Sequence, residues 1–100
     1  MDLDFVAQRE RQRAEWRERG EWSDVLSLAH VRVGLERLIY LYTQRAMTDD
    51  GCVDVARLSG YERERMNTLT IDLMVVAERQ EELRELARVC SAARSVERSV

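Results

Sequence analysis

The sequence predicts an all-α protein, a small three-helix bundle made of a polar first helix, an apolar central helix and a long last helix. The chain of 100 residues has no proline and only four glycines, and 35% of its residues are charged. This composition favours long helices over a sheet with many turns. Apolar residues also recur at steps of three and four, which is the period of an α-helix. The length suits a single domain that spans residues 1–100.

Residues 4–19 are predicted to form the first helix, with Asp2 or Asp4 as its N-cap and Gly20 just past its end. No apolar residue occurs between Gln8 and Arg13. The apolar stripe is thin and consists of Leu3, Val6, Ala7 and Ala14, with Phe5 and Trp16 on a neighbouring face. We therefore expect this helix to depend on ion pairs such as Glu15 with Arg19, and to be completed by a partner.

Residues 24–47 are predicted to form the central helix, with Ser23 and Asp24 at its N-cap. Its first apolar stripe consists of Leu28, Val31, Leu35, Leu38, Ile39, Tyr42 and Ala46. A second stripe at seven-residue spacing consists of Leu26, Val33, Tyr40 and Met47. Because a helix that is apolar on two sides needs neighbours on two sides, we expect it to lie between the other two helices. Leu38 should then be a core residue.

The segment 48–51 is predicted to be a turn with Asp50-Gly51 at its tip, and Asp54 should cap a short helix over residues 54–58. Residues 60–94 are predicted to form the last helix, opened by a capping box of Ser59 and Glu62. Its seam, which should lie along the central helix, consists of Met66, Leu69, Leu73, Val76, Gln80, Leu83, Ala87 and Cys90. The last few residues are expected to fray.

No pattern of catalytic or metal-ligating residues is visible. His30 is the single histidine and has no nucleophile at recognisable spacing, and Cys52 and Cys90 lack the spacing of a metal or redox site. The loop carboxylates Asp49, Asp50 and Asp54 do not follow the register of a calcium-binding loop. We therefore predict that the chain is not an enzyme and needs no cofactor or metal.

The charge balance argues against nonspecific nucleic-acid binding. Sixteen arginines and no lysine stand against nineteen acidic residues, for a net charge of −3, and no segment is a basic patch. The N-terminus does not have the form of a secretory signal, and the longest apolar run is far shorter than the roughly 20 residues of a membrane span. With only two cysteines, a reduced, cytoplasmic setting is expected, with no membrane partner.

One stretch has the spacing of a DNA-reading helix-turn-helix unit. A small residue, a turn glycine and later apolar residues occur in order at Val55, Ala56, Gly60, Tyr61, Met66 and Leu69. The second helix of this unit would present Arg63, Arg65, Asn67 and Thr68 to DNA. Glu62 and Glu64 lie between these residues, and the capping box explains Ser59-Gly60 equally well.

Two acidic clusters predict a protein-binding surface instead. Four carboxylates lie along one face of the last helix, at Glu78, Glu81, Glu82 and Glu85. The first helix and the joint after it place acidic residues beside two tryptophans, at Glu15, Trp16, Glu18, Glu21, Trp22 and Asp24. Aromatic anchors ringed by charge are typical of interfaces. The alternative is a solvated face paired to Arg79, Arg84 and Arg88, with both tryptophans half-buried in the bundle.

In size, in composition and in acidic helical character over the whole chain, the sequence resembles small phage- and prophage-encoded anti-CRISPR proteins, particularly inhibitors of type I surveillance complexes. The resemblance implies a non-catalytic inhibitor that binds a protein subunit of a nucleic-acid-binding complex, blocks its DNA binding and acts in the host cytoplasm. A helix-turn-helix regulator and a structural or assembly subunit are the alternatives. The chain could act as a monomer or as a homodimer.

Overall fold

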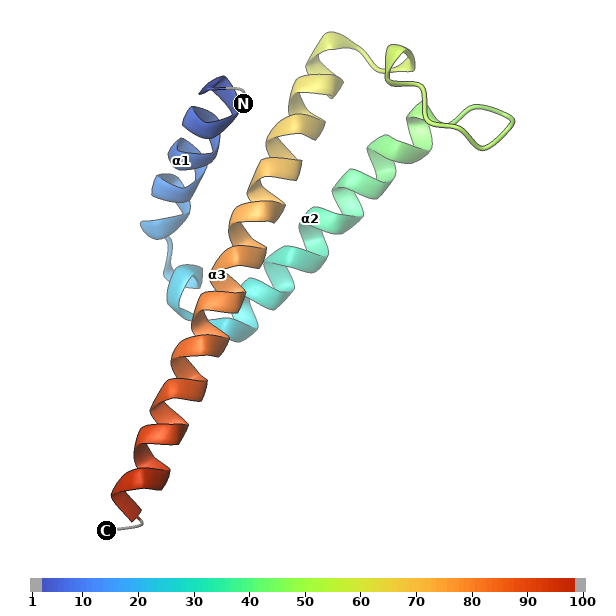
Figure 1. Cartoon of the computed structure of the whole chain (residues 1–100). Coiled ribbons are helices and arrows are strands. Elements are labelled where there is room, and N and C mark those ends of the chain that lie inside the picture. The colour runs from blue at the N-terminus through green and yellow to red at the C-terminus, as the bar shows by residue number, and fades with distance from the viewer. Residues whose placement is uncertain (1–2, 99–100) are drawn as a thin grey trace.

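The protein is an all-α bundle of three helices, seen in a computed structural model that describes residues 3–98 (Figure 1). The three α-helices are α1 (Leu3–Arg17), α2 (Val25–Ala46) and α3 (Gly60–Arg98). Two short 3-10 helices lie between them, η1 (Gly20–Ser23) before α2 and η2 (Val55–Arg57) before α3. In this described part of the chain, no helix has both the length and the apolar character that a membrane span requires.

The end of α1 differs from the prediction. The helix stops at Arg17, where the backbone N–H of Arg19 donates to the carbonyl of Trp16 at 3.0 Å, and Gly20 opens η1. Among the described glycines, Gly51 has a positive φ and Gly20 does not. The expected left-handed cap at Gly20 is therefore wrong. Asp4 lies in the first turn of α1 and is not its cap. Asp2, the other predicted cap, lies outside the described residues.

The predicted caps of the other helices are confirmed. A side-chain oxygen of Asp24 accepts the backbone N–H groups of Leu26 at 3.0 Å and Ser27 at 3.4 Å, which ties down the start of α2. Ser59 and Glu62 form the reciprocal capping box of α3, with N···O distances of 3.2 and 3.1 Å.

The connection between α2 and α3 is held by local hydrogen bonds. Gly51 adopts a φ of 83° in the predicted turn, and its N–H donates to the carbonyl of Thr48 at 3.0 Å. Asp54 accepts from the N–H of Ala56 at 3.0 Å, but the element that it caps is a single 3-10 turn over residues 55–57 and not a helix over 54–58. These bonds fix where α2 ends and where α3 begins.

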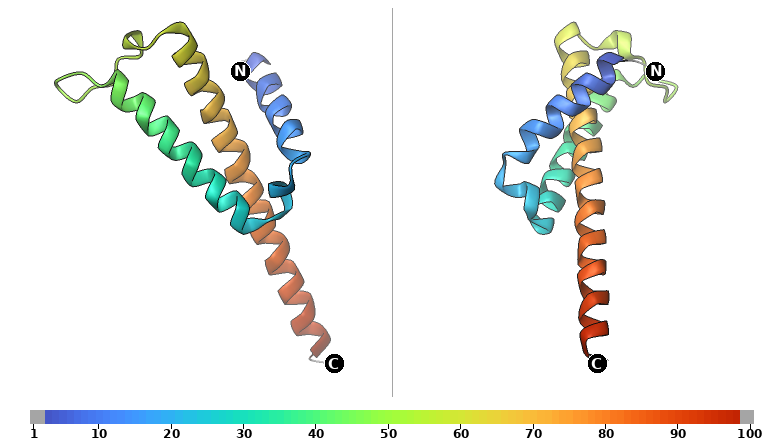
Figure 2. Two further views of the ribbon diagram at one scale, coloured as in Figure 1. Left: turned by 180° about the vertical axis from the view of Figure 1, so that it is seen from behind. Right: turned by 60° about the vertical axis from the view of Figure 1, so that its left-hand side comes forward.

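The central helix of the bundle is α3, not α2. Figures 1 and 2 show α1 and α2 on different flanks of the first half of α3, and α3 is the helix that both of them contact. Val75 and Val76 are adjacent in sequence and both fully buried, which requires neighbours on two sides of α3. The prediction that α2 lies between the other helices is therefore wrong.

The core forms where the three helices meet. It contains Leu28 and Leu35 of α2 on one side and residues of α1 and η1 on the other. Its buried members are Trp16, Trp22, Leu28, Leu35, Leu69, Val75 and Val76, with Val31, Ile39, Tyr42, Leu73 and Leu83 packed against them. Most of the first predicted stripe of α2 thus faces the core. Leu38 does not, because 41% of its surface remains exposed.

The second half of α3 extends beyond the bundle. Arg79 lies beside η1, since it bonds to the carbonyl of Trp22, and Gln80 lies beside the first half of α2, since it bonds to Arg32. All described side chains from Arg84 to Arg94 are exposed. The predicted seam along α2 therefore ends at Leu83, and the assignment of Ala87 and Cys90 to it is wrong. The helix continues to Arg98, and the last two residues of the predicted frayed end, Ser99 and Val100, lie outside the described residues.

Candidate interaction surface

The contact of α1 with α3 is built around a buried carboxylate. Asp72 of α3 is only 9% exposed, and one of its oxygens accepts the indole N–H of Trp16 at 3.0 Å and the amide of Gln12 at 2.6 Å. A buried carboxylate is costly unless such donors surround it. Both donors come from α1, so Asp72 fixes which face of α1 turns toward α3.

The face of α1 that packs on α3 is therefore polar, which reverses the prediction. The described members of the predicted apolar stripe, Val6, Ala7 and Ala14, are all exposed, and so is Phe5. The residues that are partly or fully buried are Gln8, Arg9, Gln12, Arg13 and Trp16. Apolar periodicity missed this face because its burial depends on Asp72, a residue 56 positions beyond Trp16.

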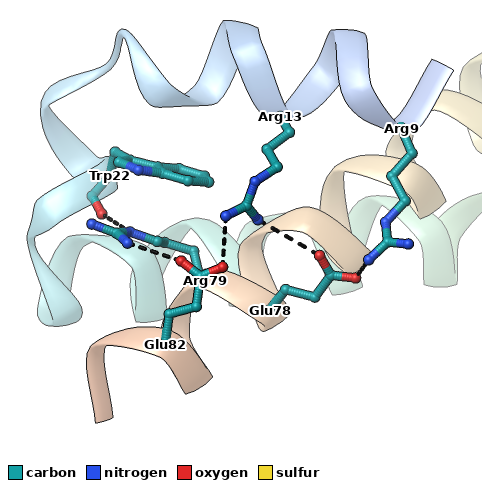
Figure 3. Close-up of polar contacts among 6 residues, drawn as sticks. All are labelled: Arg9, Arg13, Trp22, Glu78, Arg79 and Glu82. Atoms are coloured by element: carbon teal, nitrogen blue, oxygen red, sulfur yellow. Dashed lines mark hydrogen bonds and ion pairs between the residues drawn. The ribbon is translucent and has the colours of Figure 1, made fainter. Parts of the chain in front are cut away.

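Ion pairs extend this contact toward η1, as Figure 3 shows. Glu78 pairs with Arg9 and lies 3.7 Å from Arg13, while Glu82 accepts from Arg13 at 2.6 Å and from Arg79 at 2.9 Å. Two of the four α3 carboxylates that were predicted to bind a partner are thus used inside the chain. They bind α1 and orient Arg79 on α3.

Two arginines lie against the ring of Trp22 at the same place. The guanidinium carbons of Arg13 and Arg79 lie 5.0 and 4.8 Å from its ring centre, and Arg79 donates to the Trp22 carbonyl at 2.8 Å (Figure 3). Trp16 is stacked in a similar way by Arg19, at 4.2 Å. Trp16 is 6% exposed and Trp22 is 7% exposed. The prediction that they are surface anchors for a partner is wrong, because both rings belong to the core.

The remaining acidic residues lie in two segments that are far apart in sequence and that one contact joins. The bond between Trp22 and Arg79 brings η1 against α3, and with it the carboxylates that precede α2. We name the acidic junction as the partly or fully exposed carboxylates of these two segments, Glu15, Glu18, Glu21, Asp24, Glu81 and Glu85. Glu81 and Glu85 pair with Arg84 at 3.3 Å and Arg88 at 2.5 Å on the open side of α3. Exposed pairs of this kind contribute little to stability.

Glu82 gives the α1 contact a pH dependence. Hydrogen bonds from Arg79 and Arg13 hold the pKa of Glu82 below its ordinary value of 4.5. Because the folded-state pKa is the lower one, these bonds contribute stability that is complete above pH 4.5 and is lost as the pH falls through the lowered pKa.

We expect the melting temperature of Glu82→Gln to lie below that of the parent at neutral pH. When the pH is lowered from about 5 to about 3, the melting temperature of the variant should also fall less than that of the parent, because the variant lacks the carboxyl group that titrates. Thermal melts at both pH values test this, with the exposed Glu64→Gln as the matched control that should follow the parent. Equal falls in Glu82→Gln and the parent would contradict the role given to Glu82.

The helix-turn-helix prediction fails in its geometry. The element before the turn, Val55–Arg57, is three residues of 3-10 helix, too short to form the first helix of such a unit. Arg63 and Arg65 are exposed, but Asn67 donates to Gln8 at 3.4 Å and Thr68 is partly buried. Part of the proposed DNA-reading face thus lies against α1.

The outer face of α2 is an exposed apolar surface, although the two apolar stripes predict neighbours on both sides of this helix. Leu26, Val33 and Tyr40, three of the four members of the second predicted stripe, are all exposed, as are Val25, Leu38 and Leu41. The two-sided apolar pattern of α2 was the sequence signal for this exposed face. It indicates a protein-binding face as well as it indicates burial within the chain.

The remaining candidate residues are not gathered into a reactive cluster. His30 is exposed, and Cys52 and Cys90 are free, exposed thiols. Asp50 accepts from Thr48 and from the N–H of Cys52, so it holds the turn in place. In residues 3–98, no three histidine, cysteine or acidic residues come together as a metal site.

Comparison of the chain with family models, with known proteins and with solved structures finds no match.

Proposed function

We propose that this chain is a non-catalytic protein-binding inhibitor that covers a basic surface on a subunit of a nucleic-acid-handling complex and so blocks DNA binding. The observation that carries the proposal is the acidic junction, a set of exposed carboxylates on two distant segments that the contact of Trp22 with Arg79 joins. Exposed carboxylates attract a protein surface that binds phosphates. Carboxylates and phosphates both present negatively charged oxygens to arginine and lysine side chains.

The outer face of α2 supplies the apolar area that a specific interface needs. It begins at Val25 and Leu26, directly after Asp24 of the acidic junction, and continues through Val33 to Tyr40 and Leu41. Apolar contact accounts for most of the buried area in such complexes, and charge sets the association rate and the orientation. The inhibitor class comes from the resemblance to type I anti-CRISPR proteins, and a basic protein surface is the partner that suits these charges.

The test begins with capture of partners from the native host on the immobilised chain, followed by binding measurements at two salt concentrations. The test variants are Glu18→Arg with Glu21→Arg and Glu81→Arg with Glu85→Arg. A matched control, Glu10→Arg with Glu64→Arg, makes the same change in charge at exposed positions outside the acidic junction.

At least one test variant should associate more slowly by roughly tenfold at low salt, and the difference should shrink as salt rises. The control should bind like the parent, and all variants should keep the parental helicity by circular dichroism. If both test variants bind as tightly as the parent with the same salt dependence, the proposed mechanism is wrong. A labelled DNA duplex serves as a second probe, and submicromolar binding that weakens steeply with salt would favour the DNA-binding regulator.

A further inference from the structure

The second half of α3 is a helix with an uncovered apolar face. Residues 84–98, which we name the arm, project past the ends of α1 and α2 in Figure 1 and in both views of Figure 2. Leu86 is 55% exposed and Val89 is 56% exposed. Most of the stability of a helix in a protein comes from packing of its apolar face. A bare helix with such a face is best stabilised by a second surface.

The apolar face of the arm continues the face on which the bundle is built. At 3.6 residues per turn, Leu86, Ala87, Val89, Cys90 and Ala93 fall within one half of the helix circumference. The same half carries Asp72, which bonds to α1, the core residues Val75 and Val76, and Leu83, which packs against the core. Glu81, Arg84, Glu85 and Arg88 lie on the opposite half. An occupant of the arm would therefore continue the packing of α1 and α2.

The charges along α3 identify the occupant. Residues 78–85 contain four glutamates and two arginines, whereas residues 86–98 contain three arginines and one glutamate. A second α3 that runs in the opposite direction places its basic end beside the acidic segment of the first, and the reverse holds at the other end. A parallel arrangement would bring like charges together.

We propose that the chain forms a homodimer through antiparallel packing of the two arms. Leu86 of one copy packs against Cys90 of the other, and Leu83 packs against Ala93, which places the two-fold axis near Arg88. Arg94 of each copy then lies near Glu82 of the other. This dimer is independent of the proposed function, since its packing contacts lie on the half of α3 opposite Glu81 and Glu85 and do not involve the outer face of α2.

Light scattering after gel filtration at about 100 μM tests the dimer, a concentration at which an interface with a micromolar Kd is filled. The parent should have twice the monomer mass of 11.7 kDa. Leu86→Glu with Val89→Glu should return the mass to that of the monomer. The matched control, Val33→Glu with Tyr40→Glu, changes two similarly exposed residues of α2 and should remain dimeric.

Distances between spin labels test the orientation separately. In a chain with Cys52→Ser, Cys90→Ala and Arg98→Cys, antiparallel arms place the labels roughly 30 Å apart, because each lies ten residues from the axis at about 1.5 Å per residue. Parallel arms would bring them within about 20 Å, close to the spacing of packed helices plus the label length. A monomeric parent, a dimeric arm variant, a monomeric α2 control or the shorter distance each overturns the proposal.

Discussion

Replacing Trp16 with alanine is expected to lower the free energy of unfolding by about 3–5 kcal/mol, the range for removing a large buried aromatic side chain. The ring is buried at the α1–α3 contact, and its N–H donates to Asp72. The loss would therefore combine a cavity with a buried carboxylate that keeps only the bond from Gln12. Urea unfolding followed by circular dichroism measures the effect.

Trp16→Phe separates the two contributions. It keeps most of the ring packing and removes the indole N–H, so we expect a smaller loss of about 1–3 kcal/mol, the cost of an unsatisfied buried polar group. If Trp16→Ala unfolds at the same urea concentration as the parent, the ring is not part of the core. Trp16 would then again be a candidate anchor for a partner.

Replacing Leu28 with alanine is expected to cost about 2–5 kcal/mol, because Leu28 is fully buried between α2 and α3. Leu38→Ala is the matched control, the same change on the same helix at a position with 41% exposure. It should cost less, about 1–2 kcal/mol, because 41% of the surface of Leu38 remains in water after folding. Equal losses in the two variants would contradict the orientation of α2 in the bundle.

The helices could be predicted from the sequence because local chemistry determines them. Asp24, Ser59 and Glu62 act within a few residues of their own position, and the structure has each cap where the pattern indicates it. The apolar spacing of α2 correctly places Leu28 and Leu35 in the core. These features need no knowledge of the rest of the chain.

The arrangement of the helices could not be predicted in the same way. Apolar spacing favours burial of Val6, Ala7 and Ala14 in α1, but Asp72 and Glu82 of α3 instead select the face that carries Gln12, Arg13 and Trp16. A single carboxylate within an apolar run, Thr70-Ile71-Asp72-Leu73, was the available signal. The pattern of α2 likewise does not say whether its second apolar face meets this chain or another one.

The residues of the candidate site could be predicted from the sequence, but their separate roles could not. Sequence spacing identified the acidic residues, but it could not separate Glu78 and Glu82, which bind α1, from Glu81 and Glu85, which face outward. It also could not show that Trp22 and Arg79 join the two segments that carry the acidic clusters. Only contacts between segments distant in sequence separate these roles.

The central claim is that α3 carries neighbours on two sides and α2 on one, which leaves the outer face of α2 and the acidic junction available to a partner. Hydrogen–deuterium exchange of the backbone amides tests it most directly. We predict that the slowest-exchanging amides lie between Leu69 and Gln80 of α3, because local opening there must break contacts with both other helices. If the slowest amides lie instead in the middle of α2, and those of residues 69–80 exchange as fast as an exposed helix, then α2 is the central helix and the account is wrong.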